Sequence, residues 1–298
     1  MPNTLEQQNN LHNQLKDIGY IADSGLVSSL HLMDLLGKPL LIEGEAGVGK
    51  TEIAKCLSVI HQAPLIRLQC YEGLDAQHAL YDWDYKRQLL AIQMAGGAQT
   101  TSNSESLKSA VYSDDFLLQR PLLAAIRSTE RAVLLIDEVD RADEEFEALL
   151  LEVLSDFQVS VPELGTYTAV QKPWVILTSN AVRELSDALR RRCLYHYIDY
   201  PGAAAELSIV RARLPDISLQ LAHQVVNYVQ TLRQSQLRKT PGIAETLDWA
   251  AAMMGLGVDD LTTNTEAIEN TLACLLKTRE DREFVYRPAV ASDAEDGQ

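Results

Sequence analysis

The sequence predicts an α/β protein in which a mainly parallel sheet is flanked by helices and followed by a smaller, all-helical domain. In the first part of the chain, short apolar segments alternate with longer segments of helical periodicity, which is typical of βαβ units. From Gly202 onward the helical periodicity continues and no strand-like segment follows. We therefore expect an α/β domain at residues 1–201 and a helical domain at 202–285. The small, acidic residues 286–298 are expected to form a disordered tail.

Five short apolar segments are the expected strands of the sheet. Each is bounded by glycine, proline or polar residues and is too short for a buried helix. They are Pro39–Gly44, Pro64–Cys70, Ala132–Asp137, Trp174–Asn180 and Leu194–Pro201. Apolar residues recur at helical spacing in Leu5–Leu36, before the first strand, and in Thr51–Ile60, after it.

The charge balance argues against a general role in binding nucleic acid. The chain has 42 acidic and 26 basic residues, a formal net charge of -16. Non-specific binding of DNA or RNA depends on neutralising phosphates with Lys and Arg, so an acidic protein starts at a disadvantage. Anionic membrane surfaces are disfavoured for the same reason.

The cysteines and the N-terminus indicate a cytoplasmic protein. The four cysteines lie far apart and form neither a CxxC pair nor a zinc-binding spacing, so we expect reduced thiols. The first residues, MPNTLEQQNN, lack the basic-then-apolar order of a signal peptide. No apolar run reaches the roughly 18 residues needed to span a bilayer, so no membrane insertion is expected.

The segment GEAGVGKT, from Gly44 to Thr51, matches the phosphate-binding pattern GxxxxGK[ST]. It follows an expected strand and opens an expected helix, as the motif requires. Glycines let consecutive N–H groups curl around phosphate oxygens. The alternative interpretation is a glycine-rich turn that matches the pattern by chance. Lys50 is expected on the β- and γ-phosphates and the Thr51 hydroxyl on Mg²⁺. The nucleotide-binding candidates here are Gly44, Glu45, Ala46, Gly47, Val48, Gly49, Lys50 and Thr51.

Two carboxylates, Asp137 and Glu138, end the third expected strand. Ligands bind at the carboxyl edge of parallel sheets, so both should face the phosphate site. Asp137 is expected to bind Mg²⁺ together with Thr51, and Glu138 to polarise the attacking water. The alternative is that the two acidic residues only cap a helix that begins near Arg141.

Two further polar features follow in the chain. Asn180 ends the strand WVILTSN, where its amide could orient the water or the γ-phosphate, or could simply form a turn. Three arginines, Arg190, Arg191 and Arg192, precede the last strand. They could form a solvated basic turn or supply an arginine finger to a neighbouring subunit, which would tie catalysis to assembly.

Together these residues resemble the AAA+ superfamily of P-loop NTPases and, within it, the MoxR family. The resemblance extends from about Gly19 to about Trp249 and is most specific in LIEGEAGVGKTEIAK, in the segment around AVLLIDEVDRADEEF, in WVILTSN and in LSDALRRRCLYHYIDYP. It implies the AAA+ fold, with the helical domain as a lid. It also implies a β-hairpin within Phe157–Lys172.

The resemblance assigns roles to the candidate residues. By their positions in the matching motifs, Lys50 and Thr51 correspond to Walker A of the family, Asp137 and Glu138 to Walker B, and Asn180 to sensor 1. Arg192, or else Arg191, corresponds to the arginine finger. The implied cofactors are ATP and Mg²⁺.

One position departs from the family pattern. The family commonly has an arginine after a Ser-Pro pair at the start of a lid helix, where it reaches the γ-phosphate as sensor 2. The corresponding stretch here is Arg238–Gly242, with Gly242 where that arginine would stand. Either Arg238 or Lys239 replaces it, or sensing is relaxed in this chain.

The compact length and the lid motif RKTPGIAETLDWA resemble the ATPases linked to maturation of carbon monoxide dehydrogenase and related molybdenum enzymes. This implies an ATP-hydrolysing chaperone that forms a hexameric ring and works with a von Willebrand factor A-domain partner on a metalloenzyme client. The alternatives are a motor acting on nucleic acid and a nucleotide-dependent scaffold with low turnover. The expected hairpin has one lysine, Lys172, and no aromatic residues interleaved with basic ones, which argues against nucleic acid.

Overall fold

The computed structural model describes residues 4–96 and 111–286. The predicted disordered tail, 286–298, therefore lies outside the described residues except for Tyr286. Within the described ranges, no helix has the length and apolar character needed to cross a membrane.

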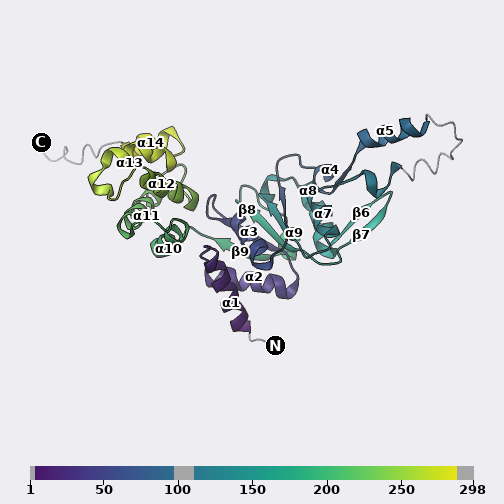
Figure 1. Ribbon diagram of the computed structural model, residues 1–298, viewed down its shortest axis with the longest axis horizontal. Coiled ribbons are helices and arrows are strands. Elements are labelled where there is room, and N and C mark those ends of the chain that lie inside the picture. Colours follow the sequence, from purple (N-terminus) through teal and green to yellow (C-terminus); the bar gives the residue numbers. More distant parts are fainter. Residues whose placement is uncertain (1–3, 97–110, 287–298) are drawn as a thin grey trace, which may run out of the picture. The chain divides into compact units, whose positions relative to one another are not determined.

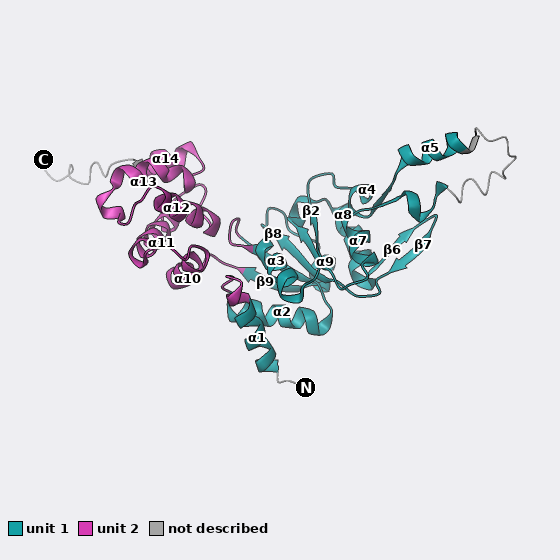
Figure 2. Ribbon diagram, viewed as in Figure 1, with its two compact units in different colours: residues 1–14, 22–44, 50–197 teal, residues 15–21, 45–49, 198–298 magenta. Residues whose placement is uncertain are grey.

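The chain divides into two compact units, coloured separately in Figure 2. The first unit comprises residues 1–14, 22–44 and 50–197, and the second comprises residues 15–21, 45–49 and 198–298. The loop 45–49, which lies within the phosphate-binding motif, therefore belongs to the same compact unit as the helical part of the chain.

The first unit contains a five-stranded sheet in the order β2-β5-β8-β1-β9, with helices packed around it (Figure 1). Its strands are β1 (Leu40–Gly44), β2 (Leu65–Gln69), β5 (Val133–Asp137), β8 (Trp174–Ser179) and β9 (Leu194–Ile198). The pairs β2–β5, β5–β8 and β8–β1 are parallel. Every residue of β5 and β8 is buried, as expected for central strands covered on both faces. The predicted fold class, a parallel sheet flanked by helices, is confirmed.

The remaining elements of this part of the chain are mostly helices. They are α1 (Thr4–Asp17), α2 (Ser24–Leu36), α3 (Lys50–His61), α4 (Ala76–Ala79), α5 (Tyr85–Gly96), α7 (Pro121–Arg127), α8 (Glu144–Asp156) and α9 (Asp187–Arg192), with the 3-10 turns η1 (Asp114–Phe116) and η2 (Val139–Arg141). The helical segment expected over Leu5–Leu36 is in fact two helices. Gly19 adopts a left-handed φ of 81° between them. The Asp23 carboxylate then accepts a hydrogen bond from the Leu26 N–H at 2.7 Å and caps α2.

Two small antiparallel pairs accompany the main sheet. The hairpin of β6 (Gln158–Val161) and β7 (Gly165–Thr168) lies within the expected range Phe157–Lys172. The pair of β3 (Tyr81–Trp83) and β4 (Leu117–Gln119) is not predicted by the sequence, because each strand has only three residues and the two are distant in the chain.

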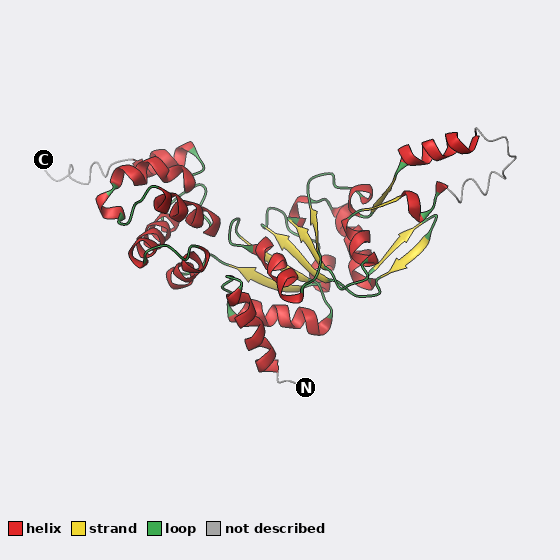
Figure 3. Ribbon diagram, in the orientation of Figure 1, coloured by secondary structure: helices red, strands yellow, loops and turns green. Residues whose placement is uncertain are grey.

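The second unit is helical after β9: among its described residues beyond Ile198 no strand occurs (Figure 3). Its helices are α10 (Ala203–Arg213), α11 (Leu219–Gln234), α12 (Ile243–Gly255), α13 (Thr265–Thr271) and α14 (Arg279–Tyr286), with the 3-10 turns η3 (Leu261–Thr263) and η4 (Leu272–Cys274). The fully buried Trp249 lies in an apolar core that also contains Val225, Val229 and Leu275.

A buried ion pair fixes the start of α12. Both nitrogens of the Arg233 fork donate to the Glu206 carboxylate at 2.7 Å, and the Thr246 hydroxyl donates to the same carboxylate at 2.7 Å. The Arg233 Nε–H donates to the carbonyl oxygen of Pro241 at 2.8 Å. The turn at Pro241–Gly242 is thus held from inside the helical core.

Candidate nucleotide site

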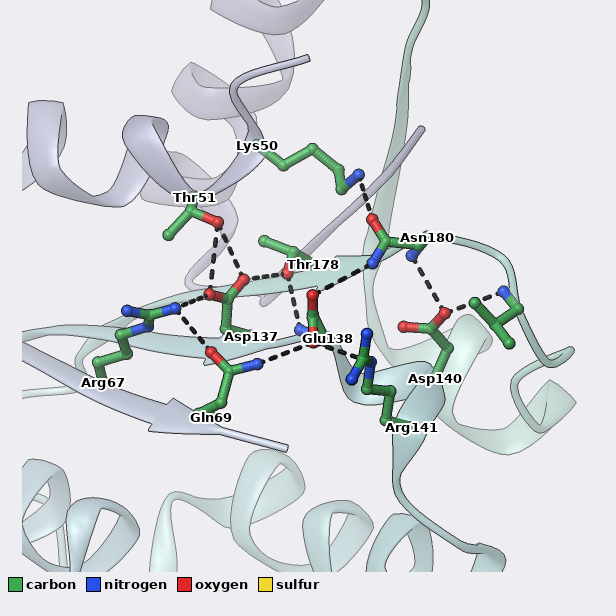
Figure 4. A network of polar contacts seen from close by, with 11 residues as sticks. Lys50, Thr51, Arg67, Gln69, Asp137, Glu138, Asp140, Arg141, Thr178 and Asn180 are labelled. Carbon is green, nitrogen blue, oxygen red and sulfur yellow. Dashed lines mark hydrogen bonds and ion pairs between the residues drawn. The ribbon is translucent and has the colours of Figure 1, made fainter. Parts of the chain in front are cut away.

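Lys50 is the first residue of α3 and points toward the end of β8 (Figure 4). Its Nζ donates to the carbonyl oxygen of Gly44 at 2.6 Å and to the Asn180 Oδ1 at 2.7 Å. The side chain is buried, which is costly for an ammonium group unless it is hydrogen-bonded. Two residues of the predicted site, distant in sequence, therefore meet directly.

Asp137 ends β5 and is the centre of the polar network in Figure 4. The hydroxyls of Thr51 and Thr178 donate to its Oδ1 at 3.1 Å and 2.5 Å. The Arg67 guanidinium donates to its Oδ2 at 2.5 Å. The carboxylate is buried, and each of its oxygens accepts at least one hydrogen bond.

Glu138 adopts a left-handed backbone conformation, with φ 54° and ψ 50°. Non-glycine residues seldom adopt it, and the surrounding contacts must compensate its cost. Its N–H donates to the Thr178 hydroxyl at 2.9 Å, and its Oε2 accepts from Gln69 at 3.0 Å and from Arg141 at 2.9 Å. Its side chain makes no helix cap. The capping alternative is therefore not observed for Glu138.

Asn180 is positioned through its backbone. Its N–H and that of Val182 donate to the Asp140 Oδ2 at 3.2 Å and 2.9 Å. Its side-chain Nδ2 lies 3.5 Å from the Glu138 Oε1. The buried Asp140 thus holds the strand end whose amide lies between Lys50 and Glu138.

The loop from Glu45 to Gly49 packs against the start of α12 in the second unit. Gly47 and Gly49 have positive φ angles of 79° and 93°, which suit glycine. The Ile243 N–H donates to the carbonyl oxygen of Gly47 at 3.0 Å. A Cβ added at Gly242 would lie 2.9 Å from the Gly47 Cα, closer than real Cβ atoms approach backbone. Gly242 therefore permits a main-chain contact at the position where, by the resemblance, a sensor 2 arginine would stand.

The two basic residues considered as replacements for that arginine make other contacts. The backbone N–H groups of Arg238 and Lys239 donate to the buried Asp281 carboxylate at 2.6 Å and 3.1 Å. The Arg238 side chain is largely exposed and lies 3.4 Å from Glu280.

The three consecutive arginines lie on α9, and the contacts of Arg190 and Arg192 are separate from the network in Figure 4. Arg190 lies 3.3 Å from Glu43. The Arg192 Nε–H donates to the Ser155 hydroxyl at 2.7 Å, and both Arg191 and Arg192 are exposed. Their exposure suits a contact with another molecule.

The donors near the phosphate-binding loop suit Mg²⁺. The Thr51 hydroxyl and the Asp137 carboxylate are hard oxygen ligands 3.1 Å apart. In the described ranges, no group of three His, Cys, Asp or Glu residues could hold a metal by itself. A magnesium ion would therefore need phosphate and water oxygens to complete its octahedral shell.

Cys70 follows β2 beside this network but is not a nucleophile. Its N–H donates to the carbonyl oxygen of Asp137 at 2.9 Å. Burial and the nearby carboxylates raise the pKa of its thiol to about 12, so it stays protonated at neutral pH. All four cysteines are free thiols.

Three further residues, Arg67, Gln69 and Thr178, belong to the network although they are part of no recognised motif. Arg67 and Gln69 alternate on β2, and Gln69 is in register with Asp137 across the parallel pair. Two polar residues at alternate positions of an otherwise apolar strand are a weak signal of this placement. The sequence around Thr178 gives no signal of its place in the network, because a threonine in a buried strand is common.

A phosphate-binding loop at the start of a helix, with two carboxylates at the carboxyl end of a parallel strand, defines a P-loop NTPase. A family model described as "AAA domain (dynein-related subfamily)" matches residues 39–193, more than half of the chain. The chain belongs to this family, and it is an AAA-type ATPase domain followed by a helical region.

Two curated relatives are similar in sequence. The gas vesicle ATPase GvpN of Haloferax mediterranei is 25% identical over 212 residues, which cover 67% of this chain and 57% of that protein. The chain thus spans less than two thirds of the length of GvpN. An uncharacterized protein of Staphylococcus aureus strain USA300 is 21% identical over 278 residues, covering 89% of this chain and 94% of the relative.

Solved structures of RuvB from Thermotoga maritima are also similar. A mutant form matches with a TM-score of 0.49 and 18% identity, covering 89% of this chain and 69% of that chain. The structure described as the RuvB Holliday junction branch migration motor matches with a TM-score of 0.47 and 17% identity, covering 88% and 68%. A likeness of this degree says nothing about the activity of this chain.

Proposed function

We propose that this protein is an ATP-hydrolysing AAA+ chaperone that remodels a client protein. The observation that carries the proposal is the network that joins Lys50, Asn180, Asp137 and Glu138 at one edge of the sheet. Asp137 is also bonded to Thr51 of the phosphate-binding motif. The family match supports ATP as the nucleotide.

Each residue of the network has a distinct proposed role. The main-chain amides from Gly44 to Gly49 bind phosphate oxygens, and Lys50 neutralises them. Thr51 and Asp137 would hold Mg²⁺, which supplies further positive charge at the phosphates. Asn180, fixed through its backbone, orients the attacking water or the γ-phosphate.

Glu138 is the proposed general base. Its carboxylate polarises the attacking water and accepts a proton at one of its oxygens. Gln69 and Arg141 hold Oε2, and Oε1 faces Asn180. The less firmly bonded Oε1 is therefore the oxygen suited to accept the proton.

The exposed arginines support a role in an assembly. We propose that Arg192, or else Arg191, reaches the γ-phosphate site of a neighbouring subunit in a hexameric ring. Such a finger stabilises charge in the transition state and raises rates by about 10³ to 10⁵ in known systems. Binding of ATP would then not require the finger, but hydrolysis would.

The finer biological assignment rests on the resemblance to the MoxR family. We propose a cytoplasmic protein with an α/β domain at 1–201 and a lid at 202–285. Its partner would be a von Willebrand factor A-domain protein, and its client a metalloenzyme of the carbon monoxide dehydrogenase type. The net charge of -16 favours such a protein client over nucleic acid.

Two substitutions in the site test the ATPase proposal. Lys50→Ala should abolish ATP binding, because the phosphates lose their ammonium partner. Glu138→Gln should still bind ATP but release phosphate about 10² to 10⁴ times more slowly, because the amide is a poor base. Equilibrium binding of a fluorescent ATP analogue and steady-state phosphate release measure the two effects.

Lys55→Ala is the matched control, since Lys55 is on the same helix with its side chain 56% exposed and paired with Glu52. It should leave both quantities unchanged. Undiminished ATP affinity of Lys50→Ala would reject the site. Undiminished turnover of Glu138→Gln, by contrast, would reject Glu138 as the base. If the unsubstituted protein binds ATP without turnover, it is a nucleotide-dependent scaffold. Affinity purification of the Glu138→Gln protein held with ATP would identify partner and client.

A further inference from the structure

The carboxylate expected to bind the metal already carries a side-chain cation. The Arg67 Nη2 lies 2.5 Å from the Asp137 Oδ2, while Thr51 and Thr178 engage Oδ1. The Asp137 side chain is 4% exposed, but that of Arg67 is 52% exposed. Figure 4 shows the guanidinium approaching from β2, on the side of the carboxylate away from Asn180.

A guanidinium and a divalent cation cannot use this carboxylate oxygen independently. Both are positive, and an ion bound beside Asp137 would lie within a few ångströms of Arg67, where like charges repel strongly. The hydroxyl of Thr51 is neutral and can serve as a metal ligand from its present position. Arg67 is therefore the contact of Asp137 that must weaken when the metal binds.

The position of Arg67 allows it to leave at low cost. It is on β2, at the edge of the sheet, and its side chain is half in solvent. The half-exposed guanidinium can be hydrated when it leaves, and the incoming metal ion replaces its positive charge beside the buried carboxylate. The same Nη2 also donates to the Gln69 Oε1 at 2.6 Å, so the displaced guanidinium would keep a partner on its own strand.

We propose that Arg67 competes with the divalent cation for Asp137 and so sets the Mg²⁺ concentration at which the site holds nucleotide. This rests on the proposed function, since it concerns the metal of the same ATP site. Arg67 is a positioning residue for the metal ligand. Raising the free Mg²⁺ concentration would convert the site from the guanidinium-paired to the metal-bound form.

A magnesium titration tests the competition. A fluorescent ATP analogue is held at fixed concentration, and the Mg²⁺ concentration for half-maximal binding is measured. Arg67→Met removes the charge but keeps most of the apolar stem, so its midpoint should fall at least about fivefold, which is the upper end measured for ion pairs that are fully solvent-exposed. Arg67→Lys retains the charge and should return the midpoint toward that of the unsubstituted protein.

Lys55→Met is the control for loss of one positive charge, because the Lys55 side chain is similarly exposed at 56% and belongs to the same unit. Its midpoint should match that of the unsubstituted protein. A second probe is Mn²⁺ alone, whose binding to the nucleotide-free protein is followed by electron paramagnetic resonance. Arg67→Met should bind Mn²⁺ more tightly than the unsubstituted protein.

The outcomes separate the two proposals. A Mg²⁺ midpoint that is unchanged or higher in Arg67→Met overturns the competition but leaves the ATP site standing. If Arg67→Met does not fold, Arg67→Gln replaces it as the charge-removing variant: a lower midpoint supports the competition, and an unchanged or higher midpoint overturns it. If the unsubstituted protein fails to bind ATP at any Mg²⁺ concentration, the proposed function is rejected and the competition with it.

Discussion

In each unit of this protein a buried carboxylate is paired with an arginine that differs in exposure: Asp137 with Arg67 in the first unit, and Glu206 with Arg233 in the second. Asp137 of the first unit pairs with an Arg67 side chain that is 52% exposed. Glu206 of the second unit pairs with an Arg233 side chain that is only 7% exposed. The carboxylates are alike in burial, so the difference lies in the partner.

The hydrogen bonds around Glu206 leave it no capacity for another ligand. Arg233 contacts both oxygens, and Thr246 and Gln230 each donate at 2.7 Å. Asp137 instead faces a solvent-accessible cation and a hydroxyl that can bind metal. We infer that a fully enclosed, saturated pair maintains structure, whereas a half-exposed pair is available for exchange with a ligand.

The largest expected effect tests the enclosed pair. Glu206→Ala would leave the Arg233 guanidinium buried without its carboxylate, which typically costs about 3–5 kcal/mol. The helical elements of the second unit should lose protection first, because Arg233 also donates to the carbonyl oxygen of Pro241. Hydrogen exchange of peptides from α11 and α12, with urea unfolding of the whole protein, measures the loss.

The double variant Glu206→Met with Arg233→Met is the control for this prediction. Replacing both members of a buried pair by apolar residues is often neutral. Most of the lost stability should therefore return. If Glu206→Ala alone is as stable as the unsubstituted protein, the pair does not stabilise the second unit and the comparison fails.

The second prediction concerns the turn that the enclosed pair holds. In Gly242→Ala the added Cβ would approach the Gly47 Cα to 2.9 Å and the Ala46 carbonyl oxygen to 3.0 Å. Both are main-chain atoms that cannot move freely, so overpacking should cost about 1–3 kcal/mol. ATP affinity should fall as well, because the Ile243–Gly47 hydrogen bond no longer holds the loop.

Gly255→Ala is the matched control, since it lies at the other end of α12 and an added Cβ meets no atom within 4 Å. It should be neutral or slightly stabilising. Urea unfolding and binding of the fluorescent ATP analogue follow both variants. Equal behaviour of the two alanine variants would show that the close approach at Gly242 has no consequence.

The smallest expected effect comes from a third ion pair, Asp34 with Arg131, in which both side chains are partly exposed. Burial raises the pKa of Asp34, but hydrogen bonds from Trp174 and Arg131 outweigh it and leave that pKa below the usual value. A lowered pKa in the folded state adds stability above about pH 4, the ordinary aspartate pKa, and the gain disappears as pH falls through the folded pKa. Asp34→Asn should thus cost about 1 kcal/mol or less at pH 7.

Urea unfolding at neutral and acidic pH checks this last prediction. The difference between Asp34→Asn and the unsubstituted protein should be constant from pH 6 to 8 and shrink below about pH 4. Asp115→Asn, an exposed aspartate of the same unit, should show no such difference. A cost that stays the same in acid would mean that the charge of Asp34 does not contribute.

Much of the architecture follows from local patterns. The five strands of the sheet were predictable because each apolar run is short and ends at a polar or glycine residue. The break between α1 and α2 was missed, because apolar residues keep helical spacing on both sides of Gly19 and hide the turn. The pair of β3 and β4 was missed because three-residue strands have no measurable periodicity.

In the candidate site, too, the residues within local motifs were predictable and those placed by distant contacts were not. The phosphate-binding loop and the carboxylates after β5 are contiguous in sequence and recognisable by motif, so they were predicted together. The close packing of Gly242 against the Gly47 main chain was not predicted. A glycine in place of an arginine does not reveal which part of the chain lies beside it. The consequence of Arg67 depends likewise on which strand lies beside β5.

By itself the sequence determined the class of the fold and the phosphate-binding motif, because strand periodicity, the glycine-rich loop and the terminal carboxylates are local properties. Only the tertiary structure decided which charges are enclosed and which are exchangeable. Arg67 lies on strand β2 and Arg233 on helix α11, but the sequence around neither shows how far its side chain is enclosed. Their surroundings do, since solvent access at a sheet edge and in a helical core depends on residues distant in the chain.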